Sequence, residues 1–256
     1  MSEILHVSLL QSVDPDPVDL VNATSSAPVI LLCEHAGCAV PASLGNLGLD
    51  DTILRSHRGW DIGAEALARA LAMRLKAPLI LQRYSRLVID SNRPPGSQES
   101  ILNESDGVRI TANDTLSKAE KEARVRGIFY PMDRAIEESF VAHPRKAAFS
   151  IHSFTPVFGG TPRPWNAGFL TRKSRSTASA LINSLQRLRP ELSLAINEPY
   201  NIDDETDWFI PRHAERRAIP HCLIEVRNDQ IADETGVALW ADLLGQALSD
   251  FMKELA

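Results

Sequence analysis

The sequence contains no apolar run close to the roughly 18 residues that a membrane-spanning helix needs. It has no basic stripe and no aromatic residues interleaved with lysines, which argues against a nucleic-acid partner. Residues 1–14 lack a positive region followed by an apolar block, so they indicate no export signal. Cysteine is scarce, and Cys33, Cys38 and Cys222 cannot all pair. We therefore expect reduced thiols in a cytoplasmic protein that binds neither membrane nor nucleic acid.

What remains is an ordinary globular composition, with 44% hydrophobic and 23% charged residues and a net charge of -6. A chain of 256 residues can bury one large core or two modest ones. No repeat, low-complexity block or glycine- and serine-rich linker divides it. Two long irregular stretches, residues 91–113 and 198–217, are typical of ordered loops at a site. We interpret residues 1–256 as one domain, whose oligomeric state the sequence does not indicate.

Strand-like and helix-like segments alternate along the whole chain, which favours an α/β sandwich. Short apolar runs predict strands at residues 29–33, 79–81, 87–89, 149–151, 167–170 and 222–226. Amphipathic patterns predict helices at residues 61–75, 117–140, 176–188 and 237–255. Asp61 can cap the first helix, and Ser117 with Glu120 forms a capping box for the second, which Pro131 should kink.

Polar side chains stand where several of the strand patterns end. Segment 147–154 places His152 at the end of an apolar run, and Glu34-His35, Asn92-Arg93 and Glu225 occupy comparable positions. A histidine at a strand terminus is held rigidly at the rim of a sheet, where a neutral imidazole can bind a metal ion. Each of these residues alone could be a core or capping residue, but their recurrence on separate strands predicts one shared site.

Two of these positions leave alternatives open. His35 precedes Ala36 and Gly37, where glycine lets the backbone turn closely, so His35 is either a metal ligand or a strand cap. Asp61 is either an ordinary N-cap or the carboxylate of a His-carboxylate-His set. Such a set suits a hydrolytic zinc site that keeps one position for water. His57 competes with Asp61 for that role.

The pair Asn92 and Arg93 is well made to hold a carboxylate, because the guanidinium fork presents parallel donors. Two prolines at positions 94 and 95 fix the loop that follows, which preorganises the fork. The alternative is a structural salt bridge from Arg93 to Asp90.

Glu225 lies inside an apolar strand pattern, where burying a carboxylate is costly unless it has a partner or a task. Near a metal-bound water it would act as a general base that then delivers the proton to the leaving amine. The alternative is an ion pair with Arg227, two residues further along the same face.

The sequence resembles the N-formylglutamate amidohydrolase family over nearly its whole length, and more distantly it is similar to zinc carboxypeptidases and acyl-amino-acid deacylases. The motifs that carry the resemblance are Cys33-Glu34-His35-Ala36-Gly37, Ser85-Arg86-Leu87-Val88-Ile89-Asp90-Ser91-Asn92-Arg93, His152-Ser153-Phe154-Thr155-Pro156, Arg163-Pro164-Trp165-Asn166 and Glu225-Val226-Arg227-Asn228-Asp229. The resemblance implies a three-layer α/β sandwich of the zinc-carboxypeptidase-like (phosphorylase/hydrolase-like) kind, with a central mixed, mostly parallel sheet.

Carried over by that resemblance, His35 and His152 would bind Zn²⁺ or another divalent metal, and Glu225 would be the base. The carboxypeptidase pattern places a ligand glutamate three residues after the first histidine, and here that position is Cys38. Either Asp61 supplies the missing ligand, which we favour, or Cys38 binds zinc directly through its thiolate.

The implied activity is hydrolysis of an N-formyl or other small N-acyl amino acid that carries a carboxylate, with N-formyl-L-glutamate giving formate and L-glutamate. Asn92 and Arg93 would hold the substrate, and Arg86 or Arg163 would stabilise the oxyanion. Arg163 is also a candidate substrate-binding residue, and His213 either touches substrate or packs against Trp208. The alternatives are a zinc carboxypeptidase or deacylase with another substrate, and a non-catalytic protein that binds a carboxylated metabolite.

Overall fold

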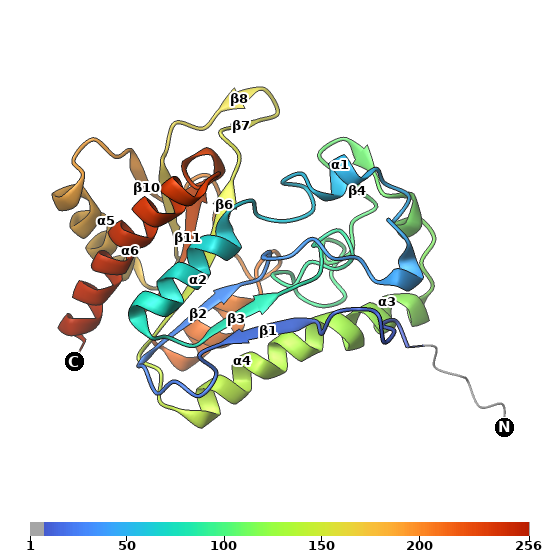
Figure 1. Cartoon of the computed structure of the whole chain (residues 1–256), viewed down its shortest axis with the longest axis horizontal. Coiled ribbons are helices and arrows are strands. Elements are labelled where there is room, and N and C mark those ends of the chain that lie inside the picture. The colour runs from blue at the N-terminus through green and yellow to red at the C-terminus, as the bar shows by residue number, and fades with distance from the viewer. Residues whose placement is uncertain (1–7, 256) are drawn as a thin grey trace.

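A computed structural model describes residues 8–255 of the chain and has a seven-stranded sheet at its centre (Figure 1). Residues 1–7, which belong to the segment in which we expect no export signal, lie outside the described part. Across the sheet, the strands are β1 (Val18–Val21), β3 (Leu79–Gln82), β2 (Val29–Cys33), β6 (Ala147–Phe154), β11 (His221–Arg227), β9 (Ala167–Leu170) and β10 (Leu194–Ile196).

Four of the neighbouring strand pairs are parallel, namely β3 with β2, β2 with β6, β6 with β11, and β9 with β10. The pairs β1 with β3 and β11 with β9 are antiparallel. The predicted mixed, mostly parallel sheet is therefore confirmed. Its edge strands β1 and β10, whose residues are largely half-exposed, have no counterpart among the predicted strands.

Helices cover both faces of the sheet (Figure 1). On one face lie α2 (Ala64–Leu75), α5 (Arg175–Leu188) and α6 (Glu234–Glu254), which pack on alternate strand residues such as Leu31 and Phe149. On the other face α4 (Tyr130–Ala142) packs on the intervening residues, such as Leu32. This alternation follows from the period of two along a strand, and it completes the three-layer sandwich.

The remaining elements are short, and several of them lie within the irregular stretches at residues 91–113 and 198–217. They are η1 (Ala42–Leu44), α1 (Asp51–Leu54), β4 (Glu104–Ser105), β5 (Val108–Arg109), η2 (Thr111–Asn113), α3 (Lys118–Arg124), η3 (Val125–Phe129), β7 (Val157–Phe158), β8 (Thr161–Pro162), η4 (Ile210–Ala214), η5 (Glu215–Arg217) and η6 (Asn228–Gln230).

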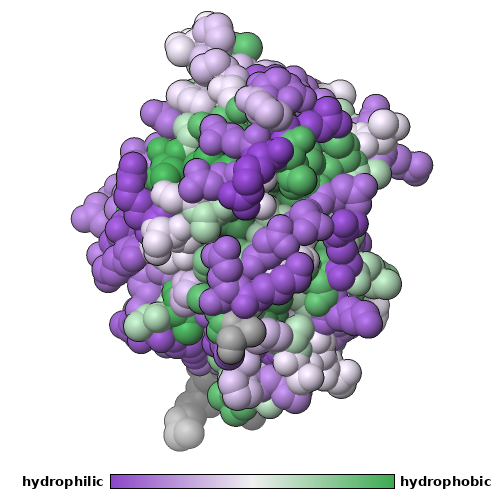
Figure 2. Space-filling model, turned by 90° about the vertical axis from the view of Figure 1, so that its left-hand side faces the viewer, coloured by the Kyte–Doolittle hydropathy of each residue, from purple (hydrophilic) through white to green (hydrophobic). Residues whose placement is uncertain are grey.

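The surface over α5 and α6, on the left of Figure 1, carries bands of hydrophilic side chains with smaller hydrophobic areas between them (Figure 2). Within residues 8–255, no helix combines the length and the apolar composition that crossing a bilayer requires.

The strand predicted at residues 87–89 is wrong. These residues form a buried turn, in which the backbone N–H of Val88 donates to Ser85 O at 2.9 Å. Side chains satisfy the carbonyls that a neighbouring strand would otherwise take. Asn113 Nδ2 donates to Leu87 O at 3.0 Å, and Arg124 Nη1 donates to Val88 O at 2.8 Å. The apolar run therefore predicts correctly that these residues are buried, but it does not predict whether their backbone pairs with a neighbouring strand.

The predicted helices are present, with one correction. The capping box of Ser117 and Glu120 is present, and Pro131 lies in the first turn of α4, directly after the π-helical turn η3. Asp61 does not cap α2, because that helix begins at Ala64 after Gly63, which has a φ of 82°. A side chain at Gly63 would also meet Ile231 O at 2.3 Å. The Asp61 carboxylate is therefore not used as a helix cap and contacts His152 instead.

Gly168 of β9 supports the loop that follows β10, and we expect Gly168→Ala to lower the free energy of unfolding by about 1–3 kcal/mol. A Cβ at this position would lie 1.6 Å from Glu198 O, so the strand or the loop would have to move. Urea denaturation measures the effect. The control is Gly127→Ala, whose added carbon meets Leu9 at an ordinary 3.4 Å. Equal stability of the two variants would contradict the close approach.

Candidate functional site

Three neighbouring parallel strands, β2, β6 and β11, bring the predicted polar residues to one end of the sheet. His35 follows the end of β2, and His152 on β6 is the register partner of Glu225 on β11. Ligand sites of open α/β sheets lie outside the carboxyl ends of their parallel strands. Asp61 joins the group from the segment before α2, where its backbone N–H donates to His35 O at 2.9 Å.

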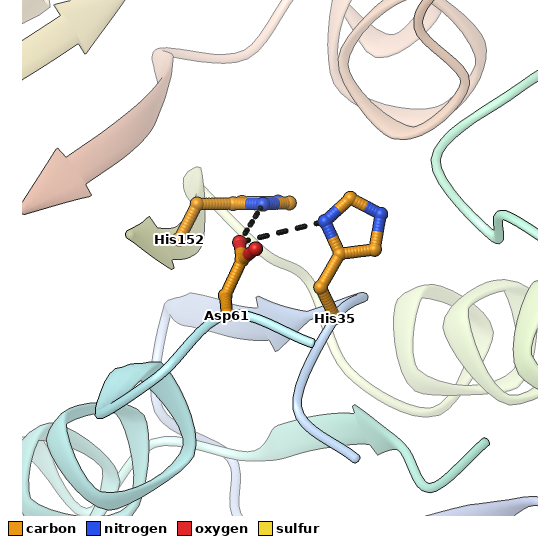
Figure 3. Close-up of side chains that lie close together, drawn as sticks. All are labelled: His35, Asp61 and His152. Carbon is orange, nitrogen blue, oxygen red and sulfur yellow. Dashed lines mark hydrogen bonds and ion pairs between the residues drawn. The ribbon is translucent and has the colours of Figure 1, made fainter. Parts of the chain in front are cut away.

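His35, Asp61 and His152 form a buried cluster in which one ligand atom from each residue lies within 4.8 Å of the others (Figure 3). Asp61 Oδ2 is 2.9 Å from His152 Nδ1 and 3.4 Å from His35 Nδ1. Two ligands held at bonds of about 2 Å can be at most about 4 Å apart, and both distances meet that limit. The two imidazole rings, with centroids 4.8 Å apart, converge as the sequence predicts.

Two further carboxylates hold the outer nitrogens of these imidazoles. His35 Nε2 donates to Asp90 Oδ1 at 2.7 Å, and His152 Nε2 lies 3.0 Å from Glu34 Oε2. The Ser150 hydroxyl also donates to Glu34. Carboxylates in this position fix the orientation of metal-binding histidines and raise their basicity. They leave the Nδ1 atoms of both rings directed toward Asp61.

The side chains present fit a divalent metal ion. His35 Nδ1 is buried and makes no hydrogen bond within residues 8–255, which is the state of a nitrogen that serves as a ligand. Two histidines and one carboxylate form a ligand set typical of hydrolytic zinc sites. Among the described residues, Cys38 falls outside the clustered group, as does His57, whose Nε2 is 3.9 Å from Asp61 Oδ1. The geometry therefore favours Asp61 over Cys38.

Electrostatics keep the carboxylates of the cluster and its surroundings ionised. Burial raises the pKa of the Asp61 carboxyl, but His35 and His152 outweigh it and hold that pKa well below its usual value. Burial likewise opposes ionisation of Asp90, whose pKa is nevertheless well below normal because His35 and Arg86 lie beside it. An ionised carboxylate is the form that binds a cation.

Glu225 faces the same space without a partner. Its Oε2 is buried and makes no hydrogen bond to the described residues. Burial, reinforced by the charge of Asp61, raises the pKa of the Glu225 carboxyl to about 7, although His152 acts in the opposite direction. Arg227 turns instead to Asp229, with Nε 2.7 Å from Asp229 Oδ1, so the alternative of a Glu225–Arg227 ion pair is wrong.

Arg86 lies beside the cluster and bridges two of its carboxylates. One nitrogen of its guanidinium is 3.3 Å from Asp61 Oδ1, and the other is 3.1 Å from Asp90 Oδ2. The Arg86 side chain is 25% exposed and lines the same cavity as the cluster, so part of its positive charge is accessible to a ligand there. A preorganised donor in such a place can stabilise an oxyanion.

These residues line a cavity of about 390 Å³. Its walls are formed by His35, His57, Asp61, Arg86, Asn92, Arg93, Glu99, His152, Ser153, Leu170, Pro199, Tyr200, Asn201, Thr206, Asp207, Leu223 and Glu225. The cavity combines the cluster of His35, Asp61 and His152 with the unpaired Glu225 carboxyl and two arginines, a combination of groups that can carry out hydrolysis.

Asn92 and Arg93 line the cavity and also secure the loop that closes it. Asn92 Nδ2 donates to Asp207 Oδ1 at 3.2 Å, and Asn92 Oδ1 accepts from the backbone N–H of Trp208 at 3.3 Å. Arg93 donates to Thr206 O, and its Nε lies 3.4 Å from Glu99 Oε2. The alternative salt bridge from Arg93 to the Asp90 carboxylate is therefore not formed.

Two predicted site residues do not line this cavity. The Arg163 guanidinium carbon lies 4.6 Å from the ring centroid of Phe158 and 4.9 Å from that of Tyr200, and Tyr200 in turn lines the cavity. His213 is fully buried beneath the loop, with Nε2 2.7 Å from Asp133 Oδ1 and Nδ1 3.0 Å from Glu137 Oε1. Its neighbours are thus helix α4 and, by stacking, Phe209, and not the metal-type cluster.

The sequence pattern did not assign Asp90 and Glu34 as the carboxylate partners of the two histidines, and it included Tyr200 only as part of the 198–217 loop. Asp90 could have been recognised from its place inside the Arg86–Arg93 motif, but the candidate partner considered was Arg93 instead of His35. Glu34 adjoins His35 and gives the same kind of signal. Tyr200 lies in an irregular loop, where no periodic pattern marks which side chain turns inward.

Comparison with known proteins gives one family match and several structures with the same fold. A model of the N-formylglutamate amidohydrolase family matches residues 27–232. The crystal structure of a gene product from Agrobacterium tumefaciens is similar at 34% sequence identity and a TM-score of 0.87, over 95% of this chain and 99% of that one. An N-formylglutamate amidohydrolase from Ralstonia eutropha JMP134 has the same fold, with 19% identity and a TM-score of 0.70 over 94% of this chain and 100% of that one. No curated protein matches the sequence.

Removal of the central carboxylate should abolish metal binding at the cluster. We expect Asp61→Asn to retain less than about a tenth of the divalent metal that the unaltered protein holds after dialysis against zinc, because a neutral amide is a weak ligand. Elemental analysis by mass spectrometry measures the content. Cys38→Ser is the matched control and should keep its metal. Loss of metal from the control, with retention by Asp61→Asn, would make Cys38 the ligand.

Proposed function

This chain belongs to the N-formylglutamate amidohydrolase family, and on that basis we propose that it hydrolyses the amide of an N-acyl amino acid, with N-formyl-L-glutamate giving formate and L-glutamate. The observation that carries the proposal is the buried Glu225 carboxyl. It has no partner within residues 8–255, and it lines the same cavity as the His35, Asp61 and His152 cluster. A carboxylate in that position is costly for stability and useful for catalysis.

The cluster would hold a divalent metal through His35 Nδ1, His152 Nδ1 and the Asp61 carboxylate. A zinc ion bound there supplies a Lewis acid that polarises the amide carbonyl and lowers the pKa of a coordinated water to about 7. Asp90 and Glu34 keep the two imidazoles oriented for this task.

Glu225 accepts a proton from the attacking water and then delivers it to the amide nitrogen as the C–N bond breaks, which releases the acid and the free amino acid. Its pKa of about 7 suits both transfers near neutral pH. Arg86, held by Asp61 and Asp90, places positive charge where the carbonyl oxygen becomes negative. No other group needs to change its protonation state.

Arg93 supports a substrate that carries a carboxylate. It lines the cavity together with Asn92 and the loop residue Thr206, to whose carbonyl it donates. A guanidinium fixed by Thr206 O through Nη1 and by Glu99 through Nε keeps Nη2 as a donor for a substrate carboxylate. A cavity of about 390 Å³ is at the lower end of the range for small-molecule sites, which suits a single amino-acid derivative.

The base is tested by Glu225→Gln, which keeps the shape of the side chain and removes its proton-accepting function. We expect turnover of N-formyl-L-glutamate to fall by about 10²–10⁴-fold, with metal content and unfolding unchanged. Released formate is measured. The control is Glu191→Gln, an exposed glutamate that pairs with Arg189 away from the cavity. Full activity of Glu225→Gln would remove the assigned base, whereas inactivity of the unaltered, metal-loaded protein on every acyl amino acid would favour a non-catalytic binding protein.

The carboxylate contact is tested by Arg93→Lys. A point charge cannot reproduce the fork, so we expect KM for N-formyl-L-glutamate to rise by about tenfold with a smaller change in kcat. Arg109→Lys, in the exposed pair with Asp114, is the control. A kcat reduced as strongly as kcat/KM would mean that Arg93 acts on the transition state and not on substrate binding.

A further inference from the structure

A second cavity of about 270 Å³ adjoins the first. The two share His57, Arg86 and Tyr200 in their walls, so these side chains stand at the boundary between them. Residues of β7 and of the β4–β5 hairpin are among those that line the second cavity. A formyl group, with its single carbon, would leave this space unfilled.

The lining of the second cavity combines apolar side chains with charges that are mostly paired. Leu102, Phe158 and Tyr200 belong to the exposed large hydrophobic residues of the described chain, at 38%, 51% and 40% exposure. Apolar side chains gathered at a cavity mouth mark a ligand surface, whereas scattered ones are common. Buried Leu87 extends this apolar wall inward.

The charged residues of the second cavity do not call for a charged ligand. Arg58 Nη2 lies 3.1 Å from Asp106 Oδ2, and Arg86 is paired with Asp90. Glu104 is exposed at the rim. The first cavity differs, because Arg93, which pairs with Glu99 through Nε and with Thr206 O through Nη1, still has Nη2 for a ligand, and Glu225 lies beside the metal-type cluster. The two cavities therefore suit the two ends of one substrate, a carboxylate end and an apolar end.

We propose that the second cavity binds the acyl part of the substrate and that the enzyme prefers N-acyl amino acids with an apolar acyl chain of several carbons over the N-formyl derivative. The inference rests on the proposed amide hydrolysis. Arg86 lies at the boundary and contacts Asp61, which places the scissile carbonyl between the cavities. With the amino-acid carboxylate at Arg93, the acyl chain then extends past His57 and Tyr200 toward Leu102 and Phe158.

The test compares kcat/KM for N-formyl-, N-acetyl-, N-butyryl- and N-hexanoyl-L-glutamate with the metal-loaded full chain. Each methylene that becomes fully buried should raise kcat/KM by about three- to fourfold. In Leu102→Asp the rise along the acyl series should be lost, because the new carboxylate lies in the apolar wall that the acyl chain is proposed to contact. Leu239→Asp changes a similarly exposed leucine on α6 and serves as the control, with the rise retained.

Hydrolysis of N-formyl-L-glutamate without any gain for longer chains would overturn the acyl site and leave the proposed function intact. A gain for N-formyl-norleucine over N-formyl-glutamate, with none along the acyl series, would also overturn it, because the apolar space would then hold the amino-acid side chain. If no compound is hydrolysed, the proposed function fails. The apolar site is then tested separately by comparing the affinities of N-hexyl- and N-methyl-L-glutamate in calorimetry. Tighter binding of the hexyl compound, lost in Leu102→Asp, supports an apolar site there, and equal affinities overturn it.

Discussion

The Asp61 carboxylate, held between two buried imidazoles, is the interaction on which the site depends. It contacts His152 Nδ1, accepts from the backbone N–H of Ser153 at 3.3 Å and receives the Arg86 guanidinium on its other oxygen. The Asp61 backbone N–H donates to His35 O. One residue thereby joins the ends of β2 and β6 to the start of α2. This is possible because Gly63 takes over the start of the helix and releases Asp61 from capping it.

The charges around Asp61 explain why such a cluster suits a cation. Glu34, Asp61 and Asp90 are buried carboxylates with lowered pKa values, and Arg86 is the guanidinium that contacts two of them. With both imidazoles neutral, as metal ligands are, three negative charges face one positive charge. Buried charge left uncompensated is strongly destabilising, and a divalent ion would balance this surplus. Burial lowers the pKa of His152, but Glu34 and Asp61 outweigh burial and raise that pKa well above its usual value. The protonated imidazole balances part of the negative charge.

The sequence allowed the centre of the fold and the centre of the site to be predicted for the same reason. Strands buried on both faces must be continuous apolar runs, so 29–33 and 167–170 were visible, and the polar residues that end such runs, His35 and His152, stood out. Features that depend on tertiary contacts were not visible. The run 87–89 is apolar like a strand, but it forms a turn because Asn113 and Arg124, which are distant in the sequence, satisfy its carbonyls. His213 looks like a site residue because nothing local reveals its contact with α4.

The position of Glu225 shows how the fold separates stability from chemistry. Arg227, two residues along β11, could neutralise it, but the strand ends there and the guanidinium turns to Asp229 and to Arg163 O. The glycine opposite Glu225 on β9, Gly168, brings the loop carbonyl of Glu198 close and directs Pro199 and Tyr200 over the cavity. The loop therefore encloses a carboxyl that it does not pair. Desolvation without compensation is what raises the pKa of Glu225, and a pKa near neutrality suits the proton transfers that we propose for this residue.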